Sequence, residues 1–256
     1  KEIGFEAVFL RCLGAQTILW VSAAVLSAGF LLLNWRLATR VSKRPFIVIG
    51  PESVTSPLPL PQVAELKPFL RSLLIAFLAL FTLLSANWAA NQWESALKFF
   101  FGLPFGSKDP IFSKDIGFYV FTLPFYKFLF SFFLTLVLVS FAMTLGIYLV
   151  NARIYLTPRG IKVADGAKMH WAMLGGVLCL LLAGHFQLRM YDLPGLQRAL
   201  APGAGYADLM AYLPGLKILR FVAVLSAVLL WLSPYYLDFK LIFGAVLLMV
   251  IGPLLA

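Results

Sequence analysis

The chain has 256 residues, of which 61% are apolar and only 12% are charged. A soluble globular domain carries about 25% charged residues, so this composition excludes an ordinary soluble domain and indicates a protein that crosses a membrane several times. The net charge of +10 is typical of Lys and Arg in loops beside anionic lipid, and we expect no nucleic-acid partner because no basic patch alternates with an aromatic platform.

Six apolar stretches between charged residues are long enough to span a bilayer, which takes roughly 20 residues across a core of about 30 Å. Tryptophans beside Arg36 and at positions 88 and 93 are typical of a membrane interface. The predicted fold is therefore all-α, a polytopic transmembrane helix bundle of about six helices that forms one domain over residues 1–256. The predicted helices occupy residues 11–34, 69–90, 124–150, 170–188, 214–233 and 239–256.

Lysine and arginine in short loops indicate which side of the membrane is cytoplasmic. Their totals on the two sides of the predicted bundle are nearly equal, so the densest clusters decide the orientation. One cluster runs from Arg36 to Arg44 and the other from Arg153 to Lys168. With both clusters in the cytoplasm, the extracytoplasmic segments are residues 1–10, 91–123 and 189–213.

The stretch KDPIFSKDIGFYVFTLPFYKFLFSFF, residues 108–133, places charges and aromatic rings just before an apolar run. Proline is tolerated in the first turn of a helix, so Pro124 predicts a helix entrance. Residues 116–122 are too apolar on both faces for an exposed strand. We expect them to form an extended or short helical segment at the membrane interface.

Asp109 and Asp115 of this stretch are its candidate reactive residues. Two carboxylates can hold a metal or transfer protons. No histidine is nearby, and no Ser or Cys stands beside a base, so we expect each aspartate to cap the following turn or to bind a neighbouring loop. The sequence therefore predicts no catalytic residue, no metal site and no enzymatic activity.

A related arrangement follows in GAGYADLMAYLPGLKILR, residues 203–220. Pro214 again precedes a helix, Lys217 follows it by three residues as Lys127 follows Pro124, and Asp208 lies upstream. Transporters often contain internal repeats. The similarity indicates either such a repeat or the independent recurrence of a helix entrance, and it predicts a second interfacial segment.

The two histidines of the chain, His170 and His185, fall on one predicted helix, roughly 22 Å apart along its axis. Imidazole can bind haem iron or a chlorophyll magnesium, so both are candidate cofactor ligands. A bis-histidine haem needs a second histidine from another helix, and polar residues near two helix ends are the simpler interpretation. Cys12 and Cys179 are expected to be packing residues. We therefore expect no cofactor.

Four stretches together resemble uncharacterised protein family 0182 (UPF0182), large multi-pass bacterial membrane proteins. They are KEIGFEAVFLRCLGAQ, DPIFSKDIGFYVFTLPFYKFL, LTPRGIKVADGAKMHWAML and GAGYADLMAYLPGLKIL. The resemblance implies the transmembrane part of a longer protein, with a further N-terminal helix and a C-terminal extracytoplasmic domain outside this chain, and a place in the bacterial inner (cell) membrane. The family has no established reaction. The positions that match its motifs, with no role implied, are Asp109, Asp115, Phe118, Tyr119, Pro124, Tyr206, Asp208 and Pro214.

Three functions are compatible with these features. A structural or accessory subunit, surrounded by the lipid bilayer and packed against other membrane-protein subunits, needs neither intramembrane charge nor a catalytic group, and we favour it. A transporter or channel for a lipid-like or envelope-related substrate is the first alternative. A haem- or chlorophyll-binding membrane protein is the second.

Overall fold

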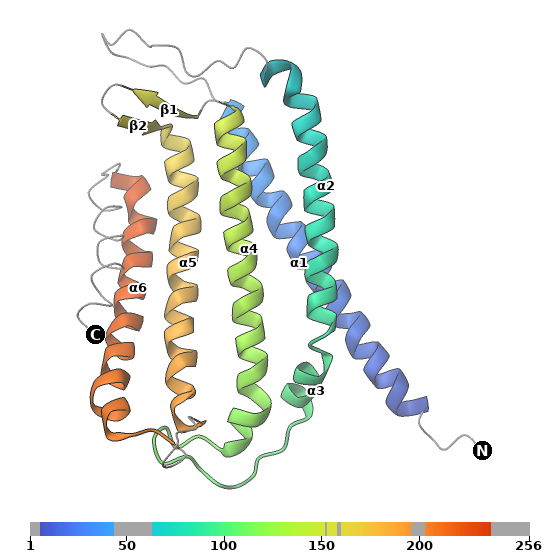
Figure 1. The fold of residues 1–256 in the computed structure, drawn as a ribbon, viewed down its shortest axis with the longest axis vertical. Coiled ribbons are helices and arrows are strands. Elements are labelled where there is room, and N and C mark those ends of the chain that lie inside the picture. Colours follow the sequence, from blue (N-terminus) through green and yellow to red (C-terminus); the bar gives the residue numbers. More distant parts are fainter. Residues whose placement is uncertain (1–5, 44–62, 152, 158–159, 196–202, 237–256) are drawn as a thin grey trace.

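The computed structural model describes residues 6–43, 63–151, 153–157, 160–195 and 203–236, and Figure 1 shows their arrangement. The predicted all-α fold is confirmed, because helices make up nearly all of the described structure. Five of them are long and apolar enough to cross a membrane, and they overlap the first five predicted stretches. The sixth stretch, 239–256, lies outside the described residues. The helices are α1 (Glu6–Lys43), α2 (Val63–Ala90), α3 (Trp93–Phe101), α4 (Leu123–Val150), α5 (Asp165–Tyr191) and α6 (Leu213–Tyr236).

The helices extend beyond the apolar stretches that predict them. α1 continues to Lys43, although the sequence predicted an end at residue 34, and α5 begins at Asp165 rather than at residue 170. Arginine and lysine are good helix formers, so Arg36 and Arg40 do not interrupt the backbone hydrogen bonds of α1. Gaps between charges therefore locate the apolar part of a helix and not its ends.

Helices α4, α5 and α6 stand side by side, and α1 crosses obliquely behind α4 and α2 in the view of Figure 1, with contacts to both. At one end, α1 and α4 finish, α5 begins, and a short antiparallel hairpin pairs β1 (Ile154–Thr157) with β2 (Gly160–Val163). We call this the hairpin end. These strands were not predicted from the sequence. At the other end lie α3 and the loops before α4 and α6.

α1 buries one face with heptad-like spacing. Its buried residues recur every three or four positions, which places them on a single stripe. Hydrogen bonds from the same side join it to α2: the Trp20 indole N–H donates to Asn87 at 2.9 Å, and the hydroxyls of Ser27 and Ser85 lie 2.8 Å apart. The stripe consists of Ala23, Ser27, Leu31, Asn34 and Ala38.

The closest approach between long helices is that of α5 and α6. A Cβ added to Gly176 would lie 2.1 Å from the Trp231 indole nitrogen, and one at Gly175 would lie 3.2 Å from Leu230. The same indole donates to the backbone carbonyl of Met173 at 3.2 Å. Gly176 thus makes room for the Trp231 indole of α6, which forms a partly buried hydrogen bond with the backbone of α5.

Each of the two predicted interfacial segments is helical. Residues 118–122 and 208–212 form single wide turns that continue directly into α4 and α6, and in each the N–H of the following leucine bonds to the carbonyl five residues before it. The next residue in both cases is proline, whose ring clashes with the carbonyl four residues before it in a regular helix. A single wide turn accommodates that clash, which explains why the same geometry occurs at Pro124 and Pro214.

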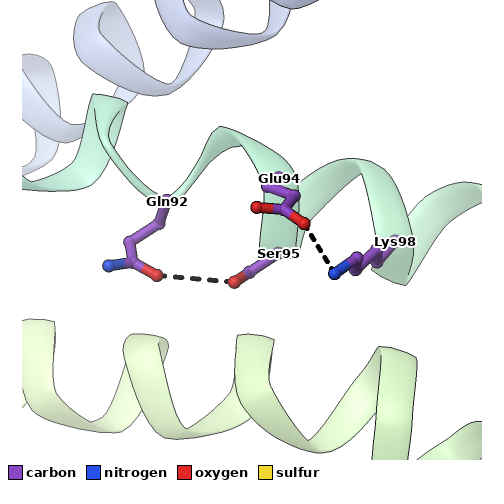
Figure 2. Close-up of polar contacts among 4 residues, drawn as sticks. All are labelled: Gln92, Glu94, Ser95 and Lys98. Atoms are coloured by element: carbon purple, nitrogen blue, oxygen red, sulfur yellow. Dashed lines mark hydrogen bonds and ion pairs between the residues drawn. The ribbon is translucent and has the colours of Figure 1, made fainter.

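α3 connects α2 to the loop before α4. Figure 2 shows its polar side, where Lys98 forms an ion pair with Glu94 at 2.7 Å and Ser95 donates to the Gln92 side chain at 3.4 Å. Both charged side chains are exposed, so the pair adds only about 0.3–0.5 kcal/mol. Ala96 and Phe99, which lie on the side of α3 away from Glu94 and Lys98, pack into a cluster with α1 and α4.

Candidate functional site

Asp115 binds the backbone of its own loop. Its carboxylate accepts N–H groups from Phe105 at 2.9 Å, Gly106 at 2.8 Å and Gly117 at 2.7 Å. A Cβ at Gly117 would lie 2.8 Å from this carboxylate, so only glycine fits there. The N–H of Phe105 is the largest influence that holds the pKa of Asp115 below its ordinary value, with help from the other two donors and from Lys108.

Asp109 fixes the preceding turn. Its side chain is only 7% exposed, and Oδ2 accepts the N–H of Phe112 at 2.6 Å and the hydroxyl of Tyr119 at 3.1 Å. The backbone N–H of Asp109 donates to Lys114 at 2.8 Å, which closes the loop on itself. Phe118, the next motif position, packs edge-to-face on Tyr191 at 5.0 Å. The two carboxylates thus hold a loop and do not face each other as an acid–base pair.

The second motif, residues 203–220, has an aspartate that also binds the backbone of its own loop. The carboxylate of Asp208, which is buried, accepts the backbone N–H of Gly205 at 2.8 Å. Tyr206 is 79% exposed, and Pro214 is exposed at the start of α6. Lys127, three residues after Pro124, forms an ion pair with Asp192 at the end of α5. These positions organise the end of the bundle opposite the hairpin.

His170 lies in a buried hydrogen-bond network that joins three helices. Its Nδ1 is 2.7 Å from the Tyr148 hydroxyl of α4, and its Nε2 is 3.0 Å from Oδ1 of Asn34 on α1. The Asn34 amide donates to the Phe30 carbonyl at 2.8 Å, so its oxygen is left to accept from Nε2–H, and Nδ1 accepts from the tyrosine. Both ring nitrogens are engaged with protein groups.

His185, the other candidate ligand, lies toward the far end of the same helix. Its ring is partly buried and stacks on Phe130 of α4, with the ring centroids 4.9 Å apart. The two histidines therefore belong to different surroundings, and the structure does not bring them together. No group of three or more metal-ligating side chains occurs among the described residues.

A large open groove lies between α1, α2 and α4 at the hairpin end. Its volume is about 980 Å³, and most of its surface is apolar. Arg36 of α1, Arg71 of α2 and Asn151 at the end of α4 form its polar end, and from there the walls become aliphatic and aromatic. The apolar walls are Leu32, Leu70, Leu73, Leu74, Phe77, Ala142, Met143, Gly146, Ile147 and Val150, and Trp35 and Thr39 complete the lining.

The seam between α2 and α4 contains a second, smaller hollow of about 170 Å³. It begins at Phe81, whose ring stacks on Phe77 of the groove at 6.3 Å, and it reaches Trp88 and Phe132. From Asn151 to Phe132 along α4 is roughly 28 Å at 1.5 Å per residue. The two hollows, which residues 137–141 of α4 separate, therefore lie along a length of α4 close to the thickness of a hydrocarbon core, about 30 Å.

The charge at the polar end of the groove is positive. The side chains of Arg36 and Arg71 are exposed, and no described carboxylate lines the groove or forms an ion pair with either arginine. From the sequence, Arg36 was expected only in a cytoplasmic cluster of loop charges, and the groove was not predicted. The sequence shows where Arg36 and Arg71 occur in the chain. That both line the same groove depends on how three helices cross, which the sequence does not show.

Comparison with known proteins identifies relatives along the whole chain. The family described as "Uncharacterised protein family (UPF0182)" matches residues 1–256. A UPF0182 protein of Geobacter sp. strain M21 is 33% identical over 95% of this chain, which covers 27% of that protein. A UPF0182 protein of Kocuria rhizophila is 33% identical over 98% of this chain, which covers 25% of it. No solved structure matches.

A third relative, a UPF0182 protein of Pelobacter propionicus, is 31% identical over 98% of this chain and is covered over 28% of its length. The chain thus spans about a quarter of the length of these relatives. Their names give a family and state no activity. Because the family match extends over every residue from 1 to 256, the chain belongs to the uncharacterised protein family UPF0182.

Proposed function

We propose that this chain is a membrane-embedded domain that binds a lipid-like molecule in the groove between α1, α2 and α4, as part of a transporter or carrier for such a substrate. The groove, about 980 Å³ in volume with apolar walls and a positive end, is the observation that supports this function. Its volume is at the upper limit of ordinary small-molecule sites, which are about 300–1,000 Å³.

The position of the groove favours a molecule that enters sideways from the bilayer. Helices α1 and α2 leave most of their apolar side chains uncovered, including Leu73 beside the groove, which is 56% exposed. Water is absent from the interior of a bilayer, so an apolar hollow that opens toward the hydrocarbon fills with acyl chains. A polar substrate would need hydrogen-bonding groups along the walls, and the walls offer very few.

Gly146 provides a way to fill the groove without disturbing the fold. It lines the groove, and a Cβ added to it meets nothing within 4 Å. Gly146→Leu should therefore occupy part of the volume while α4 keeps its packing. Gly184→Leu is the matched control, because Gly184 is also exposed on a long helix, has the same open space and lies outside the groove.

The experiment uses the full chain in lipid nanodiscs that contain a phospholipid with a photoreactive acyl chain. The proposal predicts labelling concentrated on the α2 and α4 peptides that line the groove. Gly146→Leu should reduce that labelling several-fold, and Gly184→Leu should leave it unchanged. Uniform labelling of all exposed helix faces, unaffected by Gly146→Leu, would contradict a bound lipid.

A role as an accessory subunit is the second candidate, and the first part of α1, in which no described side chain before Ala23 is buried, supports it. Val8, Phe9 and Ile18 are each more than half exposed, as they would be if another membrane protein packed there. Purification from native membranes in a mild detergent distinguishes the two functions. Stoichiometric partner subunits that cover α1 would favour the accessory role, whereas an isolated chain with retained lipid would favour the carrier.

A further inference from the structure

We infer that the groove selects a phospholipid with a net negative headgroup, whose phosphate is held by Arg36 and Arg71. This inference rests on the proposed lipid-binding function and adds to it the chemical class of the ligand. The two arginines come from different helices, α1 and α2, and both line the same end of the groove. Each guanidinium presents five N–H donors in a planar fork that matches the oxygens of a phosphate.

Among the described residues that line the groove, only the two arginines are charged, and neither forms an ion pair with a described carboxylate. The Thr39 hydroxyl already donates to the Arg36 carbonyl at 3.0 Å, and one of the two N–H groups of the Asn151 amide donates to the Ile147 carbonyl at 2.7 Å, so the uncharged donors at this end have little left to offer a ligand. Recognition of a headgroup therefore depends on the guanidinium groups. A headgroup with no net charge would gain little from two positive charges, because its own cation would be repelled.

Helix dipoles do not supply this attraction. α1 and α4 both end here and place about half a negative charge each beside the groove, while the start of α2 contributes about half a positive charge. The dipoles together therefore weakly oppose an anion. Two full positive charges outweigh them, so the preference for a negative headgroup should disappear when the arginines are neutralised.

The position of the arginines along α1 and α2 fits a headgroup at the membrane interface and acyl chains in the hydrocarbon core. Arg36 lies near the end of the apolar part of α1, and Arg71 lies three residues after the start of the apolar part of α2 at Pro68. Long basic side chains at such positions extend to the headgroup level. From Arg71 to Phe77 the groove continues for roughly 9 Å along α2, which leads the acyl chains toward the smaller hollow.

The test measures which lipid stays with the full chain when it is purified from nanodiscs containing equal amounts of phosphatidylglycerol and phosphatidylcholine. The wild type should retain phosphatidylglycerol preferentially. Arg71→Gln should reduce that preference about fivefold, and Arg36→Gln with Arg71→Gln about 25-fold, since each arginine near a charged lipid surface contributes about 1 kcal/mol. Arg71→Lys should keep part of the preference, because it retains the charge and loses the fork.

Arg40→Gln is the control, because Arg40 is an exposed arginine on the same end of α1 that does not line the groove. It should leave the preference unchanged. If the double variant keeps the wild-type preference, or if Arg40→Gln removes as much of it as Arg71→Gln does, the headgroup inference is wrong while lipid binding in the groove stands. If retained lipid is insensitive to Gly146→Leu as well, the proposed function itself fails.

Discussion

The hydroxyl of Tyr148 on α4 lies 2.7 Å from Nδ1 of His170 on α5, inside the bundle near its hairpin end. Nε2 of the same ring reaches Asn34 on α1, so one imidazole joins three helices. The network lies next to the groove wall that α1 and α4 form. Trp35, which follows Asn34, and Ile147, which precedes Tyr148, both line the groove. This network therefore fixes the position of two of the three helices that define the candidate site.

Tyr148→Phe should destabilise the bundle by about 1–2 kcal/mol, because it leaves Nδ1 of a buried histidine without a donor. The measurement is the unfolding midpoint of the full chain during titration of a mild detergent with sodium dodecyl sulfate. Tyr206→Phe is the control, since that side chain is 79% exposed, and it should have no effect. Equal midpoints for the wild type and Tyr148→Phe would contradict the network.

Gly176→Ala should be the most harmful alanine substitution among the glycines of α5. The new methyl group would lie 2.1 Å from the Trp231 indole, so the indole must be displaced or α5 and α6 must move apart, at a cost of about 1–3 kcal/mol. Thermal unfolding in detergent should rank the variants with Gly176→Ala lowest, Gly175→Ala close to wild type and Gly184→Ala indistinguishable from it. A different order would mean that the α5–α6 contact is not as close as described.

Asp115 should make the loop before α4 sensitive to acid. The pKa of Asp115 in the folded chain is held below the ordinary value of 3.8. Its contribution to the stability of the loop is therefore fully present above pH about 4 and is lost as the pH falls through the folded pKa. Asp115→Asn should expose the amides of Phe105 and Gly106 to faster hydrogen exchange at neutral pH. The same variant should remove the acid-dependent step in the exchange of those amides. A step that survives in Asp115→Asn would have to come from another group.

The ion pair between Lys127 and Asp192 should contribute little to the free energy of unfolding. The side chains are 47% and 31% exposed, so solvent screens most of the attraction and the coupling should be about 0.2–1 kcal/mol. A double-mutant cycle with Lys127→Met and Asp192→Asn measures that coupling from the unfolding midpoints. A coupling of several kcal/mol would show that this end of α5 is far better shielded from solvent than the exposures indicate.

The position of the long helices could be predicted because charged residues are costly in hydrocarbon and therefore mark the limits of apolar stretches. The same reasoning missed helix ends: Arg36 and Arg40 continue α1, and Asp165 begins α5. The local role of Asp115 was also accessible, since a carboxylate two residues before a glycine commonly binds that backbone N–H.

The contacts between helices could not be predicted. Asn34 and His170 are 136 positions apart in the chain, and neither sequence neighbourhood indicates the other. The groove is missed for the same reason, because Arg36, Arg71 and Gly146 come from three helices whose crossing is set by packing. The sequence analysis therefore interpreted Arg36 as loop charge and attached no role to Gly146.

The most direct test of the central claim is a structure of the full chain determined by electron cryomicroscopy in nanodiscs that contain phosphatidylglycerol. The account predicts elongated density between α2 and α4, with its head against Arg36 and Arg71 and its chains passing Phe77. In Gly146→Leu that density should be displaced, and in Gly184→Leu it should remain. A groove closed by protein, or one whose lipid density has no head near the two arginines, would contradict the account.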